Sequence, residues 1–188
     1  CDSRSSTAWA VLEQKMNIVP YSANRIPQTT IDKLDFASLV GLNFVGGEPL
    51  YEKTNFYILQ KLLDHNNINC FIQITTNGSV ALSEQNRQLL SSFKNINVNI
   101  SIDGIGPVFE YLRFPLKLDK LQENIRYCQQ NGILVSVSYT VSNLNILYHN
   151  QTVKWFNENN INFLTNPVRI PNWFSPASLP LKIKEYIR

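Results

Sequence analysis

The sequence predicts an α/β fold in which parallel strands alternate with helices, and three observations support this prediction. Short β-rich runs recur about every 30 residues, which is the length of one strand–helix–strand step. Four of the five runs precede a stretch with apolar residues three and four positions apart, the spacing of an amphipathic helix. Polar residues are interspersed in the runs FIQIT and VNISID, which suits a barrel with a polar inner mouth better than a sheet buried on both faces. We therefore expect a partial TIM-like (β/α) barrel of parallel strands.

The expected strands and helices follow one another in chain order. Strands are predicted at residues 42–45, 71–75, 98–102, 133–141 and 162–164. Helices are predicted after the first four strands, at residues 52–66, 83–93, 118–128 and 147–156. Asn131-Gly132 should close the third of these helices, because glycine readily adopts a positive φ.

The two ends of the chain depart from this alternation. Residues 5–15 are expected to form a helix with Ser5 or Ser6 as its N-cap, but no strand precedes them. The first strand of the barrel is therefore expected to be missing, which exposes an edge of the sheet. Prolines recur from Pro167 onward, which predicts an extended tail before a last helix at residues 181–188.

Composition and charge exclude several classes of protein. With 188 residues, 44% of them apolar, the chain can bury a core and is expected to form one domain over residues 1–188. A net charge of +3 without a run of like charges gives no indication of nucleic-acid binding. No stretch nears the roughly 18 apolar residues of a membrane span.

Three widely spaced cysteines suit a reducing compartment, so a cytoplasmic location is expected. Position 1 is Cys rather than Met, which indicates a piece of a longer chain.

Small or polar residues stand at the ends of the first four predicted strands. They are Gly46-Gly47-Glu48-Pro49, Thr76-Asn77-Gly78, Ser101 with Asp103-Gly104, and Ser142-Asn143. In parallel α/β folds, ligands bind beyond the carboxyl ends of the strands. These loops therefore predict one polar site at that edge of the sheet, although each loop also has the composition of an ordinary turn.

The Gly46-Gly47-Glu48-Pro49 segment is the most specific of these loops. Two glycines let a ligand approach the backbone closely, and Glu48 can accept a hydrogen bond from an ammonium group. Pro49 fixes φ and leads into the next helix. No Gly-Lys-Ser/Thr follows, and the pattern is not a dinucleotide fingerprint either.

The order of these motifs resembles that of the radical S-adenosylmethionine (radical SAM) enzymes, specifically the twitch-domain type. The resemblance rests on VGGEPL, TTNG and SIDG after successive strands and on Arg113 downstream. The stretch from Cys1 to Trp9 resembles the end of the family's opening CxxxCxxC pattern, so Cys1 would be its third cysteine. The other two would lie upstream of this chain, which the resemblance covers almost entirely.

The resemblance implies the cofactors and the roles of the site residues. Three thiolates would hold a [4Fe–4S] cluster, with Cys1 as one ligand, and an external donor would supply one electron. Reductive cleavage of SAM would give a 5′-deoxyadenosyl radical, which abstracts hydrogen from an unknown substrate. By analogy to relatives, one possible class of substrate is a peptide or protein. The implied SAM contacts are Gly46, Gly47, Glu48 and Pro49 along the amino group, Thr76 and Asn77 near the ribose or the methionine, Ser101 and Asp103 as hydrogen-bonding groups, and Arg113 on the carboxylate.

Structural roles compete with these functional ones. Asp103-Gly104 is also a common turn sequence, and the stem of Arg113 can simply cover the core. Cys70, Cys128 and Tyr139 are expected in the core, whereas His65 and His149 have polar neighbours and are expected at the surface. Other functions also remain open, namely a non-enzymatic barrel-like binding domain without the cluster and, with less support, an α/β barrel that binds a phosphorylated metabolite.

Overall fold

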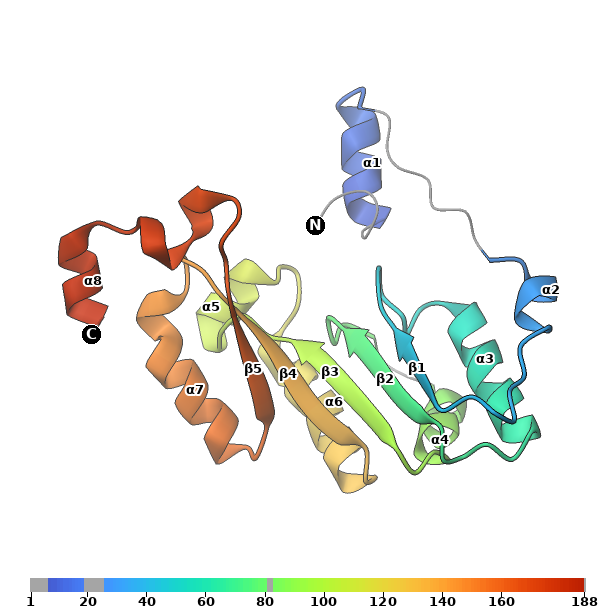
Figure 1. Ribbon diagram of the computed structural model, residues 1–188. Helices are drawn as coiled ribbons and strands as arrows, with labels where there is room; N and C mark the ends of the chain where they lie inside the picture. The colour runs from blue at the N-terminus through green and yellow to red at the C-terminus, as the bar shows by residue number, and fades with distance from the viewer. Residues whose placement is uncertain (1–6, 19–25, 81–82, 188) are drawn as a thin grey trace. The chain divides into compact units, whose positions relative to one another are not determined.

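The computed structural model describes residues 7–18, 26–80 and 83–187 and shows an α/β fold (Figure 1). Five parallel strands follow the chain in the order β1-β2-β3-β4-β5, so the sheet is open rather than closed into a barrel. The strands are β1 (Gly41–Phe44), β2 (Phe71–Thr76), β3 (Ile96–Ser101), β4 (Leu134–Val141) and β5 (Asn162–Pro167). The predicted class, a partial barrel of parallel strands, is confirmed.

Helices connect the strands as the sequence predicts. The α-helices are α1 (Thr7–Lys15), α2 (Gln28–Ile31), α3 (Lys53–Asp64), α4 (Glu84–Ser91), α5 (Gly106–Leu112), α6 (Leu118–Gln130), α7 (His149–Glu158) and α8 (Leu181–Ile187). Three short 3₁₀ helices are η1 (Ile146–Tyr148), η2 (Asn172–Phe174) and η3 (Pro176–Ser178). The sequence pattern did not predict α2, which has a single turn, or α5, which begins with Gly106-Pro107.

The chain divides into two compact units. Unit 1 comprises Cys1–Thr75 and Leu82–Ile96, and unit 2 comprises Thr76–Ala81 and Asn97–Arg188. The organisation of residues 1–188 as one domain stays a prediction. No helix in the described ranges combines the length and the apolar character that crossing a bilayer requires.

Unit 1 has its core between β1, β2 and the apolar faces of two helices. β1 pairs in parallel with β2, with Phe44 opposite Ile74. Leu59 and Leu62 of α3 and Leu90 of α4 are at most 1% exposed. Burying a leucine side chain contributes about 2 kcal/mol, which explains why the predicted apolar spacing held. α4 begins where the Ser83 hydroxyl accepts a hydrogen bond from the backbone N–H of Asn86 (3.2 Å).

Unit 2 has its core between β3, β4, β5 and helices α6 and α7. β4 pairs in parallel with both β3 and β5. Leu121 and Ile125 of α6 and Phe156 of α7 are buried. Gly132 has a φ of 71° immediately after α6, as expected of a helix-ending glycine.

The aromatic core of unit 2 confirms one expectation and corrects another. Tyr139 is fully buried, with its ring edge-on to Phe156 at a centroid distance of 5.6 Å. The prediction of a surface position is wrong for His149, whose ring stacks on Tyr139 at 5.6 Å and whose Nδ1 atom is buried. The polar neighbours of His149 in the sequence suggested an exposed position, but the first turn of α7 points this side chain inward. His65 is exposed, as predicted.

Candidate functional site

The turn after β1 lies in unit 1 and contains the predicted site residues Gly46, Gly47, Glu48 and Pro49. Gly46 and Gly47 have φ angles of 85° and 51°, and both are exposed. A side chain at either position would meet no atom within 4 Å, so the backbone conformation alone accounts for the two glycines. The turn thus presents main-chain groups to solvent, where a ligand can approach them.

Local contacts fix the second half of this turn. The Glu48 carboxylate accepts a hydrogen bond from the backbone N–H of Leu50 (3.2 Å), and the Pro49 carbonyl accepts one from the Asn55 side chain (3.0 Å). Pro49 and Leu50 are buried next to Phe44 at the end of β1. The exposed glycines are therefore anchored directly to the core of unit 1.

The turn after β2 belongs to unit 2 and is built from side-chain caps. The Thr76 hydroxyl accepts a hydrogen bond from the backbone N–H of Gly78 (3.0 Å), and the Asn77 side chain accepts one from the backbone N–H of Ser79 (2.8 Å). Gly78 has a φ of 75°, and a Cβ atom there would lie 2.2 Å from Cδ1 of Leu121. Thr76 and Asn77 thus shape this turn, and their predicted position near SAM stays a prediction.

The end of β3 carries an ion pair. Asp103 follows the strand, and Arg113 follows α5, ten residues along the chain. Nε of Arg113 lies 2.7 Å from Oδ2 of Asp103, and their side chains are 24% and 16% exposed. The two atoms are in ionic contact, but the N–H is not aligned for a hydrogen bond. The structure therefore brings together two of the residues that the sequence singled out.

Asn145 clamps the loops after β3 and β4, and the sequence reading did not single it out. Its Nδ2 atom donates to the carbonyl oxygens of Asp103 (2.6 Å) and Thr140 (2.7 Å), and its Oδ1 accepts from the backbone N–H of Ser142 (2.7 Å). The residue is only 1% exposed. The backbone N–H of Thr140 in turn donates to the Asp103 carboxylate (3.3 Å). Asp103 is thus held through both its backbone and its side chain.

A row of amides and hydroxyls lines one face of β3 and β4. Asn97 donates to the Ser136 hydroxyl (3.0 Å), and Asn99 donates to the Ser138 hydroxyl (2.9 Å). Ser101 lies opposite Ser138 in the strand register. The alternating residues on the other face, such as Val98, Ile100 and Val137, are buried. This face leads along the strands to the end where Asp103 lies.

The described residues do not provide a metal site of their own. No group of three or more His, Cys, Asp or Glu gathers within residues 7–18, 26–80 and 83–187. Cys70 and Cys128 are buried free thiols, as predicted, and burial raises the pKa of the Cys70 thiol. A raised pKa disfavours the thiolate that metals bind, so Cys70 does not fit a ligand role. Cys1, the predicted cluster ligand, lies outside the described residues.

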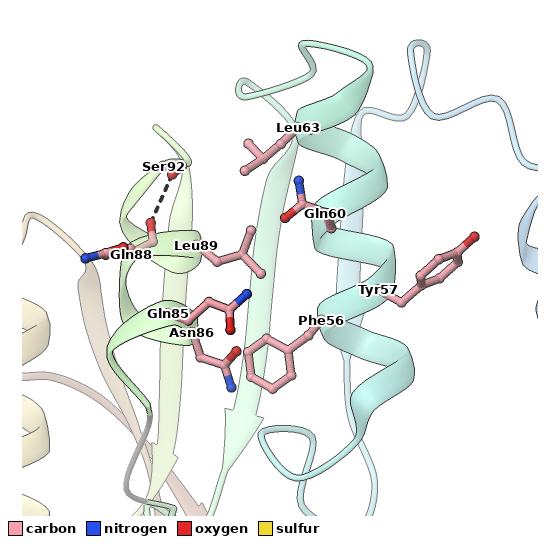
Figure 2. A pocket seen from close by; sticks show the side chains of 9 residues that line it. All are labelled: Phe56, Tyr57, Gln60, Leu63, Gln85, Asn86, Gln88, Leu89 and Ser92. Carbon is pink, nitrogen blue, oxygen red and sulfur yellow. Dashed lines mark hydrogen bonds between the residues drawn. The ribbon is translucent and has the colours of Figure 1, made fainter.

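A groove between α3 and α4 lies apart from the predicted site residues within unit 1. It has a volume of about 450 Å³. Phe56 and Leu89 point into it, and Gln60, Gln85 and Asn86 line its walls (Figure 2). None of the residues that the sequence predicted to bind SAM lines this groove.

Three solved structures show what the fold is similar to. Native anSMEcpe with bound AdoMet matches with a TM-score of 0.61 at 17% sequence identity, over 85% of this chain and 49% of that chain. SuiB of Streptococcus suis bound to S-adenosylmethionine matches with a TM-score of 0.59 at 18% identity, over 89% and 40%. The Escherichia coli coproporphyrinogen III oxidase HemN, a radical SAM enzyme, matches with 0.58 at 16% identity, over 79% and 38%.

These likenesses, each below 25% sequence identity, show that the chain shares the fold of these three proteins. The chain spans less than half the length of each solved chain, although the matches cover most of its own residues. No protein-family model matches the chain, and a search of curated proteins finds no match. Two of the matched proteins also have structures with peptides, anSMEcpe with the Cp18Cys peptide and SuiB with its precursor peptide SuiA.

Proposed function

We propose that this chain is the core of a radical SAM enzyme of the twitch-domain type. The observation that carries the proposal is the shared fold combined with the order of the motifs. Successive parallel strands end in Gly46-Gly47-Glu48-Pro49, in Thr76-Asn77 and in Ser101 with Asp103. A [4Fe–4S] cluster and SAM would together supply a 5′-deoxyadenosyl radical that abstracts hydrogen from the substrate. Cys1 would be one cluster ligand, and an external donor would provide the electron.

Arg113 has the chemistry to bind the carboxylate of SAM. Its guanidinium carries a planar fork of donors that matches a carboxylate. The contact with Asp103 engages the Nε side, and no hydrogen bond or ion pair within the described part of the chain engages the two terminal nitrogens. Ser101, Thr76, Asn77 and the residues 46–49 would complete the contacts to the rest of the cofactor.

A peptide or protein is the substrate class that we favour. The half-buried polar face of β3 and β4 consists of uncharged hydrogen-bonding groups, which suit backbone and side-chain amides better than a strongly charged metabolite. These groups are Asn97, Asn99, Ser101, Ser136, Ser138 and Thr140. The peptide complexes of anSMEcpe and SuiB agree with this choice. The reducing cytoplasm suits both the cluster and the two free thiols.

Anaerobic reconstitution of the intact protein with iron and sulfide tests the proposal. After addition of SAM and a reductant, we expect iron uptake, visible absorbance of an iron–sulfur cluster and release of 5′-deoxyadenosine. Cys1→Ala should abolish cluster uptake, whereas Cys128→Ala removes a buried core thiol and should leave it intact. A protein that takes up no iron and cleaves no SAM would instead be a binding domain. Cluster uptake at the wild-type level in Cys1→Ala would remove Cys1 from the site.

A further inference from the structure

We infer that Asp103 is a positioning residue, held by Asn145 and Thr140, that orients the guanidinium of Arg113 toward a ligand carboxylate. This inference rests on the proposed function and goes beyond the direct hydrogen bond to SAM that the sequence resemblance implies for Asp103. It also assigns a role to Asn145, which no motif identified.

The first argument is that the polar atoms of Asp103 already have partners. Its carbonyl oxygen accepts from Asn145 (2.6 Å), and its Oδ1 accepts from the backbone N–H of Thr140 (3.3 Å). Its Oδ2 lies 2.7 Å from Nε of Arg113. A carboxylate with both oxygens engaged is poorly placed to be the main contact of another ligand, but it is well placed to fix its partner.

The second argument is that only an amide can do what Asn145 does. Two carbonyl oxygens, of Asp103 and Thr140, require donors, and the N–H of Ser142 requires an acceptor. A carboxylate could not donate to the carbonyls, and an aliphatic side chain would leave all three groups without this partner. The clamp joins the loop after β3 to the loop after β4, so it sets where the Asp103 backbone lies.

The third argument concerns charge. A ligand carboxylate is attracted by Arg113 and repelled by Asp103, so the acid is useful only if it orients the arginine. With Nε held on one side, the terminal nitrogens of the guanidinium have a defined direction, and less rotamer freedom is lost when they bind a carboxylate. The side chain is 24% exposed, so it stays reachable from solvent.

Binding measurements on the intact, reconstituted protein test this role. Asp103→Asn keeps the size of the side chain and an acceptor for Thr140 but removes the charge. We expect it to weaken SAM binding by about two- to tenfold, the range for ordering one additional long side chain on binding. Methylthioadenosine, which has the adenosyl group and a thioether but no carboxylate, should bind the variant and the wild type equally. Asn145→Ala should show the same selective loss.

The matched control for Asn145 is Asn159, which directly follows α7. Asn159 is exposed, donates to the Trp155 carbonyl (2.8 Å) and has no contact with Asp103 among the described interactions. Asn159→Ala should therefore leave the affinity for SAM unchanged. In an Arg113→Gln background, Asp103→Asn should cause no further loss, because the residue that it positions is already gone.

The possible outcomes separate the inference from the proposed function. Equal losses for SAM and methylthioadenosine, no loss in Asp103→Asn, a gain in SAM affinity, or additive losses with Arg113→Gln would each overturn the positioning role while SAM binding itself stands. Wild-type protein that binds neither SAM nor methylthioadenosine would overturn the proposed function and this inference with it.

Discussion

The turn after β1 and the loops after β3 and β4 are held in different ways. In unit 1, the residues 46–49 are fixed by contacts two and six positions away in sequence, from Glu48 to Leu50 and from Asn55 to Pro49. In unit 2, Asp103 is fixed by Thr140 and Asn145, 37 and 42 positions away. A local turn forms as soon as its own strand and helix form, whereas the second arrangement requires two strands to pair in the correct register.

This difference predicts where the candidate site tolerates change. The glycine turn depends on backbone conformation, so substitutions there should affect ligand approach more than folding. The Asp103 network joins two loops of one unit, so its substitutions should affect stability and ligand binding together. Four changes test this contrast, from the largest expected effect to the smallest.

Asn145→Ala should have the largest effect on stability. It leaves the N–H of Ser142 and the carbonyls of Asp103 and Thr140 without their partner, and each unpaired buried group costs about 1–3 kcal/mol. We expect the free energy of unfolding to fall by about 3–4 kcal/mol in denaturant titration. In unit 1, Asn55→Ala removes one half-buried hydrogen bond and should cost about 1 kcal/mol. Equal losses in the two variants would contradict the contrast between the units.

Gly78→Ala and Gly46→Ala form the second test. Both glycines have a positive φ, which costs alanine about 1–2 kcal/mol. At Gly78 the new Cβ would also lie 2.2 Å from Leu121, whereas at Gly46 nothing lies within 4 Å. Thermal unfolding should therefore show a loss of about 2–3 kcal/mol for Gly78→Ala and of about 1 kcal/mol for Gly46→Ala. A larger loss for Gly46→Ala would mean that the turn after β1 packs more closely than the structure shows.

The same contrast explains which features could be predicted from the sequence. Strands and helices were predictable because apolar spacing reports directly on burial, and the Gly-Gly-Glu-Pro turn was visible because its contacts are local. Asn145 is one of 23 asparagines, and nothing in its neighbourhood distinguishes it. Its role arises only when β3 and β4 pair, which brings Asp103 next to the loop after β4. The inward position of His149 likewise depends on Tyr139 of the neighbouring strand.

Tyr139→Phe should stabilise the protein slightly. Burial raises the pKa of the Tyr139 phenol, an effect that the nearby Thr152 hydroxyl partly opposes. Thr152 nevertheless donates to the Tyr148 carbonyl (2.9 Å), and the buried Tyr139 hydroxyl has no hydrogen bond among the described residues. Removing this unpaired group should raise the free energy of unfolding by about 1 kcal/mol. A loss of stability of that size would show that the hydroxyl is hydrogen-bonded in solution.

The smallest expected effect is the slow alkylation of the Cys70 thiol in the folded protein, which reports on how often the core of unit 1 opens. The side chain is 1% exposed, and burial raises the thiol pKa above its usual value of 9.0. Because the folded state then holds its proton more tightly than the unfolded state, the contribution of Cys70 to stability is complete below pH 9.0 and falls as the pH rises further. Under native conditions, peptide mapping after treatment with iodoacetamide should find Cys70 modified only as fast as the core opens, and denaturant should restore rapid labelling. Labelling of Cys70 in the native protein as fast as in denaturant would mean that the core of unit 1 opens readily. Unit 1 would then differ from the tightly held loops of unit 2 in its core as well as in the turn after β1.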